Sequence, residues 1–270
     1  MDYKQEVMKY EKKDALIALC AYVLIIAFVL VVEHFVIAQF AQTARQGQII
    51  RIVRSVVATA TVFAIVIFRG QGLRSIGIHG DKVGSAIKLG LLFIPVPLVV
   101  NVAVPLVMYG DGLAFRPFVS MMYMLGTFFL YALWEDALFV GFLQTRIYGL
   151  FKTDKVAIGV VAVLFSLPHI TVGLATGGLG LDASSLLMYL VGLFFMHQMF
   201  VLLFRRYFSL FTVVIVHTIT NWSYTSVLRW LQESDYSVFW SAIAGLVLII
   251  GVNIWDWKIS RASNHTPKVA

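Results

Sequence analysis

Long apolar stretches recur along the chain and constrain its fold more than any other feature. The hydrocarbon core of a bilayer is about 30 Å thick, so a helix that crosses it needs roughly 20 apolar residues. Turn sequences such as Gly70-Gln71-Gly72 separate the stretches. The pattern predicts an all-α polytopic membrane protein with eight transmembrane helices, forming a single integral-membrane domain over residues 1–270. The predicted spans are Ala15–Val32, Ile50–Phe68, Ala86–Tyr109, Phe118–Leu143, Val156–Ala175, Ser185–Phe204, Phe211–Leu228 and Ser237–Trp255.

The composition excludes an ordinary soluble domain. Hydrophobic residues make up 60% of the chain and charged residues 13%, with a mean hydropathy of +0.87. A soluble domain carries about 25% charged residues, which this chain does not have. We therefore expect its net charge of +7 to face a lipid bilayer, and we predict no nucleic-acid partner. The single cysteine, Cys20, excludes a disulfide framework.

Lys and Arg are unevenly distributed over the predicted connections. They gather in both tails and in the second, fourth and sixth connections, which all lie on one side of an eight-span bundle. Lys12 and Lys13 in the N-terminal tail and Arg205 and Arg206 in the sixth connection are examples. Cytoplasmic loops of membrane proteins carry an excess of such residues. The expected location is the cell membrane, with several spans and both termini in the cytoplasm.

Ionisable residues lie inside three of the predicted spans. Glu135 and Asp136 are in the fourth, His169 is in the fifth, and His217 is in the seventh, followed by Asn221. A charge at the membrane centre costs at least about 2.5–3.5 kcal/mol, so such residues are candidates for function. His217 and Asn221 share a helix face because they are four residues apart. These five residues are therefore the candidate site.

Their chemistry suits hydrolysis. A desolvated carboxylate at Glu135 can take a proton from water while a histidine orients that water. A second histidine and the amide of Asn221 can donate hydrogen bonds to a developing oxyanion. A second arrangement stays open, in which Glu135, His169 and His217 hold Zn²⁺ with one free coordination position. A cofactor-free site is the preferred expectation, with zinc as the alternative.

The three motifs, in this order, resemble those of the CAAX protease and bacteriocin-processing family, also called Abi or type II CAAX prenyl endopeptidases. Glu135 matches the first glutamate of the family's first motif. Phe165 and His169 match its Phe-x-x-x-His motif, and His217 and Asn221 match its His-x-x-x-Asn motif. The resemblance implies that Glu135 activates the attacking water and that His169 assists. It also implies that His217 and Asn221 hold the oxyanion.

The first motif departs from the family pattern at two positions. Asp136 stands where the family has a second glutamate, and Val140 stands where it has an arginine, although Gly141 matches the glycine that follows. Arg146 lies ten residues after Asp136 and off its helix face. Asp136 is therefore predicted to be a supporting residue. The resemblance covers approximately residues 118–225.

The expected function is an intramembrane endopeptidase that cleaves a membrane-associated peptide or protein. Two alternatives remain. The first is a catalytically weak or inactive immunity or scaffolding protein of the same family, which Val140 favours. The second is a proton-coupled transporter that uses Glu135, Asp136 and His169 as a relay. His197 is predicted to have a packing role, and Glu33 with His34 is expected at the membrane boundary.

Overall fold

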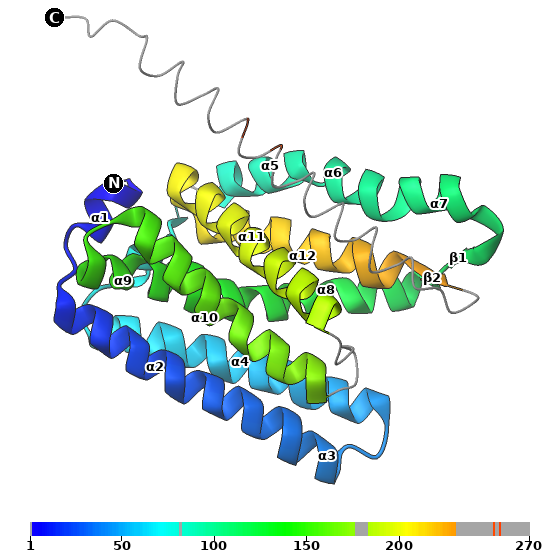
Figure 1. The fold of residues 1–270 in the computed structure, drawn as a ribbon, viewed down its shortest axis with the longest axis horizontal. Coiled ribbons are helices and arrows are strands. Elements are labelled where there is room, and N and C mark those ends of the chain that lie inside the picture. The colour runs from blue at the N-terminus through cyan, green and yellow to red at the C-terminus, as the bar shows by residue number, and fades with distance from the viewer. Residues whose placement is uncertain (1, 81–82, 176–182, 231–250, 252–253, 255–270) are drawn as a thin grey trace, which may run out of the picture.

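The computed structural model describes residues 2–80, 83–175, 183–230, 251 and 254 (Figure 1). Over these residues the predicted all-α fold is confirmed, apart from one short antiparallel pair of strands, β1 and β2. The α-helices are α1 Tyr3–Val7, α2 Lys12–Val31, α3 Ile37–Phe40, α4 Ala44–Phe68, α5 Val83–Phe93, α6 Pro95–Leu98, α7 Val104–Tyr109, α8 Phe118–Glu135, α9 Gln144–Phe151, α10 Asp154–Ala175, α11 Ala183–Tyr207 and α12 Leu210–Trp222. Shorter π or 3-10 helices are η1 Val32–Val36, η2 Leu73–Ile76, η4 Val99–Ala103, η5 Gly110–Gly112, η6 Asp136–Leu143 and η7 Ser223–Val227, and the strands are β1 Leu113–Phe115 and β2 Leu228–Trp230.

Five helices of the described chain are long and apolar enough to cross a membrane, and they correspond to the first five predicted spans. α11 occupies the position of the sixth predicted span, and α12 occupies that of the seventh but is only 13 residues long. The predicted eighth span, Ser237–Trp255, lies outside the described residues except at 251 and 254. The five spans are Lys12–Phe40, Ala44–Phe68, Val83–Val107, Phe118–Phe151 and Asp154–Thr171.

Polar residues next to the apolar stretches determine where several helices begin. The Thr43 hydroxyl accepts a hydrogen bond from the backbone N–H of Gln46, and the Gln46 side-chain oxygen accepts one from the backbone N–H of Thr43. The helix α4 begins there. Ser209 caps α12 in the same way by accepting from the N–H of Thr212. Such caps satisfy backbone donors that have no partner in the first helical turn.

The chain around Glu135 runs through the centre of the bundle. α8 continues into the π-helix η6, whose residues are all buried and which packs against α2, α4, α10, α11 and α12 (Figure 1). Phe139 of η6 meets Phe165 of α10 edge to face, with ring centroids 5.1 Å apart. The site described below therefore lies on the most enclosed segment of the described fold.

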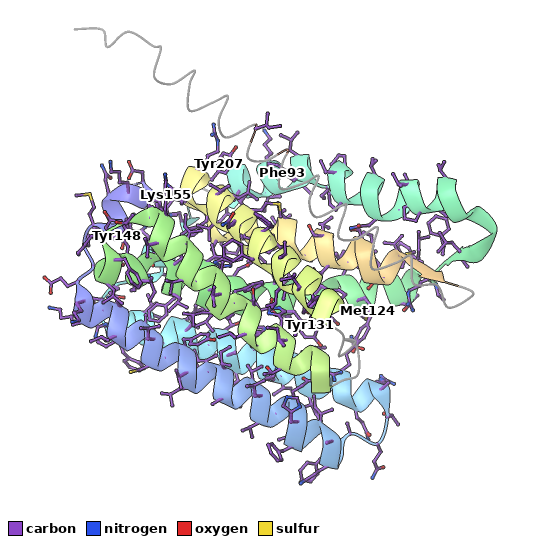
Figure 2. The ribbon with its side chains drawn as sticks, viewed as in Figure 1. Phe93, Met124, Tyr131, Tyr148, Lys155 and Tyr207 are labelled. Carbon is purple, nitrogen blue, oxygen red and sulfur yellow. The ribbon has the colours of Figure 1, made fainter. Side chains whose placement is uncertain are left out.

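The helices α5 to α7 lie along one side of the bundle (Figure 1). Gly90 of α5 allows a close approach to α12, because a β-carbon there would lie 2.6 Å from Ile215. Leu92, Val99 and Val107 are exposed on this segment, and the side chains that project outward from it are mostly carbon (Figure 2). An apolar outer surface is the expected state of a helix that faces lipid.

Arg146 anchors the N-terminal segment to the bundle. Its buried guanidinium donates to Gln71 Oε1 at 2.8 Å and to Ser75 Oγ at 2.7 Å, and it lies 4.4 Å from the ring centroid of Tyr10. Burial raises the pKa of the Tyr10 hydroxyl above its usual value, so this group remains a donor and bonds Glu6 at 2.5 Å. The hydrogen bonds of Arg146 thus join α9 to η2 and the residues before it. Arg146 does not supply the positive charge that the arginine replaced by Val140 would carry.

Candidate active site

Three predicted site residues meet between α8, α10 and α12. The Oε2 atom of Glu135 lies 3.7 Å from Nε2 of His169 and 3.7 Å from Nε2 of His217. The His217 side chain is almost fully buried, whereas Glu135 keeps 15% and His169 24% of their side-chain surface exposed. Both distances exceed that of a direct hydrogen bond, as is common in a catalytic site without substrate. The structure thus brings together one carboxylate and two imidazoles.

The second nitrogen of each imidazole is already engaged. His169 Nδ1 lies 2.7 Å from the backbone oxygen of Phe165, which only accepts, so Nδ1 carries the proton. His217 Nδ1 lies 3.1 Å from Oδ1 of Asp136 and donates to that carboxylate. Because each Nδ1 is engaged in this way, both rings turn their Nε2 atoms toward Glu135.

His169 directly follows a proline inside α10, which is helical from Asp154 to Ala175. Pro168 has no N–H, so the carbonyl of Leu164 loses its helical partner. The hydroxyl of Tyr22 on α2 donates to this carbonyl at 2.9 Å. A freed backbone group inside a membrane must find another partner, and here a second helix provides it.

Asp136 is the partner of His217. The pair is buried, with 1% of each side chain exposed. The second oxygen, Oδ2, has no hydrogen-bond partner among the described residues. With Val140 at the arginine position, no partner for this carboxylate could be predicted, and the structure identifies His217 as one. Asp136 fixes the ring of His217 from the side opposite Glu135.

Asn221 lies one turn beyond His217 on α12 and is half-buried. Its spacing puts it on the same helix face as His217. Asn101 of η4 donates to Ser223 Oγ at 2.9 Å, just past the end of α12. The end of the helix that carries Asn221 is therefore held from a neighbouring span.

Residues 117–223 match the family model described as Rce1-like, type II CAAX prenyl endopeptidase Rce1-like. The resemblance to the CAAX protease family is confirmed. No curated protein and no solved structure matches the chain. The match runs from the start of α8 to the end of α12 and includes Glu135, His169, His217 and Asn221. Tyr22, which donates a hydrogen bond to the carbonyl freed by Pro168, lies outside this Rce1-like segment.

An aromatic ring packs against each of the two imidazoles, those of His169 and His217. Phe200 lies 4.4 Å from His217, and Phe165 lies 4.5 Å from His169, measured between ring centroids. His197 of α11 stacks on Phe165 at 5.0 Å and 27°, and neither of its nitrogens has a hydrogen-bond partner in the described part of the chain. These contacts limit rotation of the site histidines. The packing role of His197 stays a prediction.

A buried cluster of charges borders the Rce1-like segment. Glu33, expected at the membrane boundary, is 7% exposed and pairs with Arg51 at 2.6 Å and Arg54 at 2.7 Å. The guanidinium of Arg54 lies 5.9 Å from the ring centroids of Tyr131 and Trp134 on α8. The sequence predicts Glu33 at the membrane boundary, and only the fold brings it and the two arginines beside α8.

Glu135, His169 and His217 are the residues that could hold a metal ion at this site. The two Nε2 atoms and the carboxylate of Glu135 are of the types that zinc accepts. However, no group of three or more His, Cys, Asp or Glu residues is arranged to hold a metal ion in the described ranges. A cofactor-free site stays a prediction, with zinc as the alternative, and the steps below involve only side chains of the protein.

Proposed function

We propose that this protein is an intramembrane endopeptidase that hydrolyses a peptide bond of a membrane-associated peptide or protein. The observation that carries the proposal is the position of one Glu135 oxygen at 3.7 Å from two imidazole Nε2 atoms. The match to a family of CAAX prenyl endopeptidases supports a protease at the general level. The burial of His217 against Phe200 supports it too, because charge interactions strengthen in a low-dielectric interior.

The chemistry follows from the residues. Glu135 takes a proton from a water molecule, which His169 orients, and the water oxygen attacks the peptide carbonyl carbon. His217 and Asn221 donate hydrogen bonds to the resulting oxyanion. Asp136 stabilises the positive charge on His217 when both of its ring nitrogens carry protons. The carbon–nitrogen bond then breaks, and Glu135 passes its proton to the leaving amine.

The substrate is identified by comparing the peptides of cells that produce the wild-type protein with those of cells that produce Glu135→Ala. We expect at least one fragment to depend on the wild-type protein, because removing the carboxylate removes the base. Identical peptide sets, with both proteins inserted in the membrane, would contradict the proposal. Purified protein treated with a chelator should keep its activity, and recovery only on adding Zn²⁺ would replace this mechanism with a metal-dependent one.

One observation favours a second candidate function. Val140 is fully buried at the position where the related family has an arginine, which suits a protein that binds a bacteriocin without cleaving it. Under this alternative, Glu135→Ala would still protect cells from the bacteriocin. Under the protease proposal, protection by Glu135→Ala is lost together with cleavage.

We also propose that both termini are cytoplasmic, on the strength of the basic connections. In a Cys20→Ala background, a cysteine at Gly112 should react with a membrane-impermeant maleimide in intact cells. A cysteine at Lys152 should react only after permeabilisation. The reverse pattern would contradict the orientation.

A further inference from the structure

Val140 leaves the helix of Glu135 without a positive charge at the family's arginine position. Its side chain is fully buried and carries no charge. Arg146, the next arginine along the chain, is engaged with Gln71 and Ser75. A carboxylate in a low-dielectric interior requires compensation, because an unpaired buried charge is costly. The imidazoles of His169 and His217 lie 3.7 Å from Glu135, and a guanidinium on another helix would add a positive charge that does not depend on their protonation.

Arg54 on α4 lies over the face of α8 that carries Glu135. Tyr131 and Glu135 are four residues apart on α8 and share a face. The guanidinium of Arg54 is 5.9 Å from the ring centroid of Tyr131 and 5.9 Å from that of Trp134. α4 packs along α8 and η6. Arg54 and Glu135 consequently attract each other electrostatically.

The ion pair with Glu33 does not neutralise the positive charge of Arg54 completely. One carboxylate, Glu33, faces two guanidinium groups, those of Arg51 and Arg54, so the three side chains together carry one excess positive charge. Arg54 is 8% exposed, and its Nε has no hydrogen-bond partner among the described residues. This excess charge lies beside Tyr131, on the face of α8 that also carries Glu135, and attracts the Glu135 carboxylate.

We propose that Arg54 is a positioning residue of the site, which supplies from α4 the positive charge that Val140 does not provide on the helix of Glu135. It keeps the Glu135 carboxylate charged and oriented between the two imidazoles without touching the substrate. The inference rests on the proposed endopeptidase function. It also assigns a role in the reaction to a residue outside the Rce1-like segment 117–223.

The test distinguishes two roles of Arg54, the supply of positive charge to Glu135 and the ion pair with Glu33. Arg54→Gln, Arg54→Lys and Glu33→Gln are made in the full-length protein, and kcat and KM are measured with one peptide substrate. We expect Arg54→Gln to lower kcat at least about tenfold with little change in KM, since Glu135 is then less often charged and oriented as the base while substrate binding is unchanged. Arg54→Lys should recover most of kcat. Glu33→Gln breaks the same ion pair but leaves the arginine charge, so its kcat should stay within about threefold of wild type.

Equal losses of kcat in Arg54→Gln and Glu33→Gln would overturn the inference, because Arg54 would then serve only as the partner of Glu33. Failure of Arg54→Lys to recover activity would overturn it as well. If Arg54→Gln does not fold, the double variant Glu33→Gln/Arg54→Gln removes both charges of the pair, and it should lose kcat where Glu33→Gln alone does not. Glu135→Gln is measured in the same series. If it remains active, the endopeptidase proposal itself fails; if it is inactive while Arg54→Gln resembles wild type, only the inference about Arg54 fails.

Discussion

At the scale of single residues, the site consists of carboxylates paired with imidazoles. Glu135 lies between the Nε2 atoms of His169 and His217, and Asp136 engages the far side of His217. Adjacent residues on one helix thus reach the same histidine from two directions. Phe165 plays the corresponding part for His169 with its backbone oxygen.

The pair of Asp136 and His217 makes a specific prediction. Asp136→Asn keeps the size of the side chain but removes its charge, so the ring of His217 loses both its orientation and the stabilisation of its charged form. Residues that orient a functional histidine typically contribute about 10–100-fold to activity. We expect kcat to fall by about this factor, measured on purified protein. Unchanged kcat in Asp136→Asn would show that this carboxylate does not support the reaction.

At the scale of helices, two departures from regular α-helical hydrogen bonding lie next to site residues. α8 changes to the π-helix η6 directly after Glu135, and α10 contains Pro168 next to His169. π-helical segments occur frequently at functional sites. Pro168 frees the carbonyl of Leu164, and the hydroxyl of Tyr22 on α2 satisfies it. The fold around the site therefore depends on contacts between helices.

Tyr22 provides such a contact, and its loss can be measured. Tyr22→Phe removes the hydroxyl that donates to Leu164 and leaves this carbonyl unsatisfied. A buried polar group without a partner costs about 1–3 kcal/mol, so the free energy of unfolding in detergent should fall by about that amount. Tyr123→Phe, at an exposed tyrosine, is the control and should have no effect. Equal stability of both variants would show that Leu164 is satisfied in another way.

At the scale of the whole molecule, the N-terminal segment closes one end of the bundle. Gly149 of α9 lies against the backbone of Glu11, and a β-carbon at this position would collide with the oxygen of Glu11. Lys152 reaches the backbone oxygen of Tyr10 at 2.8 Å. The segment before α2 is therefore packed onto α9, together with the Arg146 contacts.

Gly149→Ala tests this packing. The added methyl group meets backbone rather than a flexible side chain, so the segment must shift, and overpacking of this kind typically costs about 1–3 kcal/mol. We expect a lower melting temperature in detergent and faster proteolysis near Glu11. Gly159→Ala in α10 is the matched control, because a β-carbon there contacts nothing within 4 Å. A melting temperature as high as that of Gly159→Ala would contradict the predicted collision.

The sequence predicted the parts of this fold that depend on local patterns. Apolar length identified five spans that the structure confirms, and the spacing of four residues placed His217 and Asn221 on one face. It did not predict the contact of Asp136 with His217, that of Tyr22 with Leu164, or the place of Arg54 over α8. These join residues far apart in the chain, for which one sequence carries no periodic signal. Glu33 shows the same limit, since its burial depends on two arginines of another helix.

The measurement that tests the central claim most directly is the turnover of Glu135→Gln. The amide keeps the shape of the side chain between the two imidazoles but cannot accept a proton from water. We predict that kcat on a membrane peptide falls by about 10²–10⁴-fold, the usual contribution of a general base, while the protein inserts and unfolds like wild type. A kcat within about twofold of wild type would contradict the account, because water activation would not depend on this carboxylate.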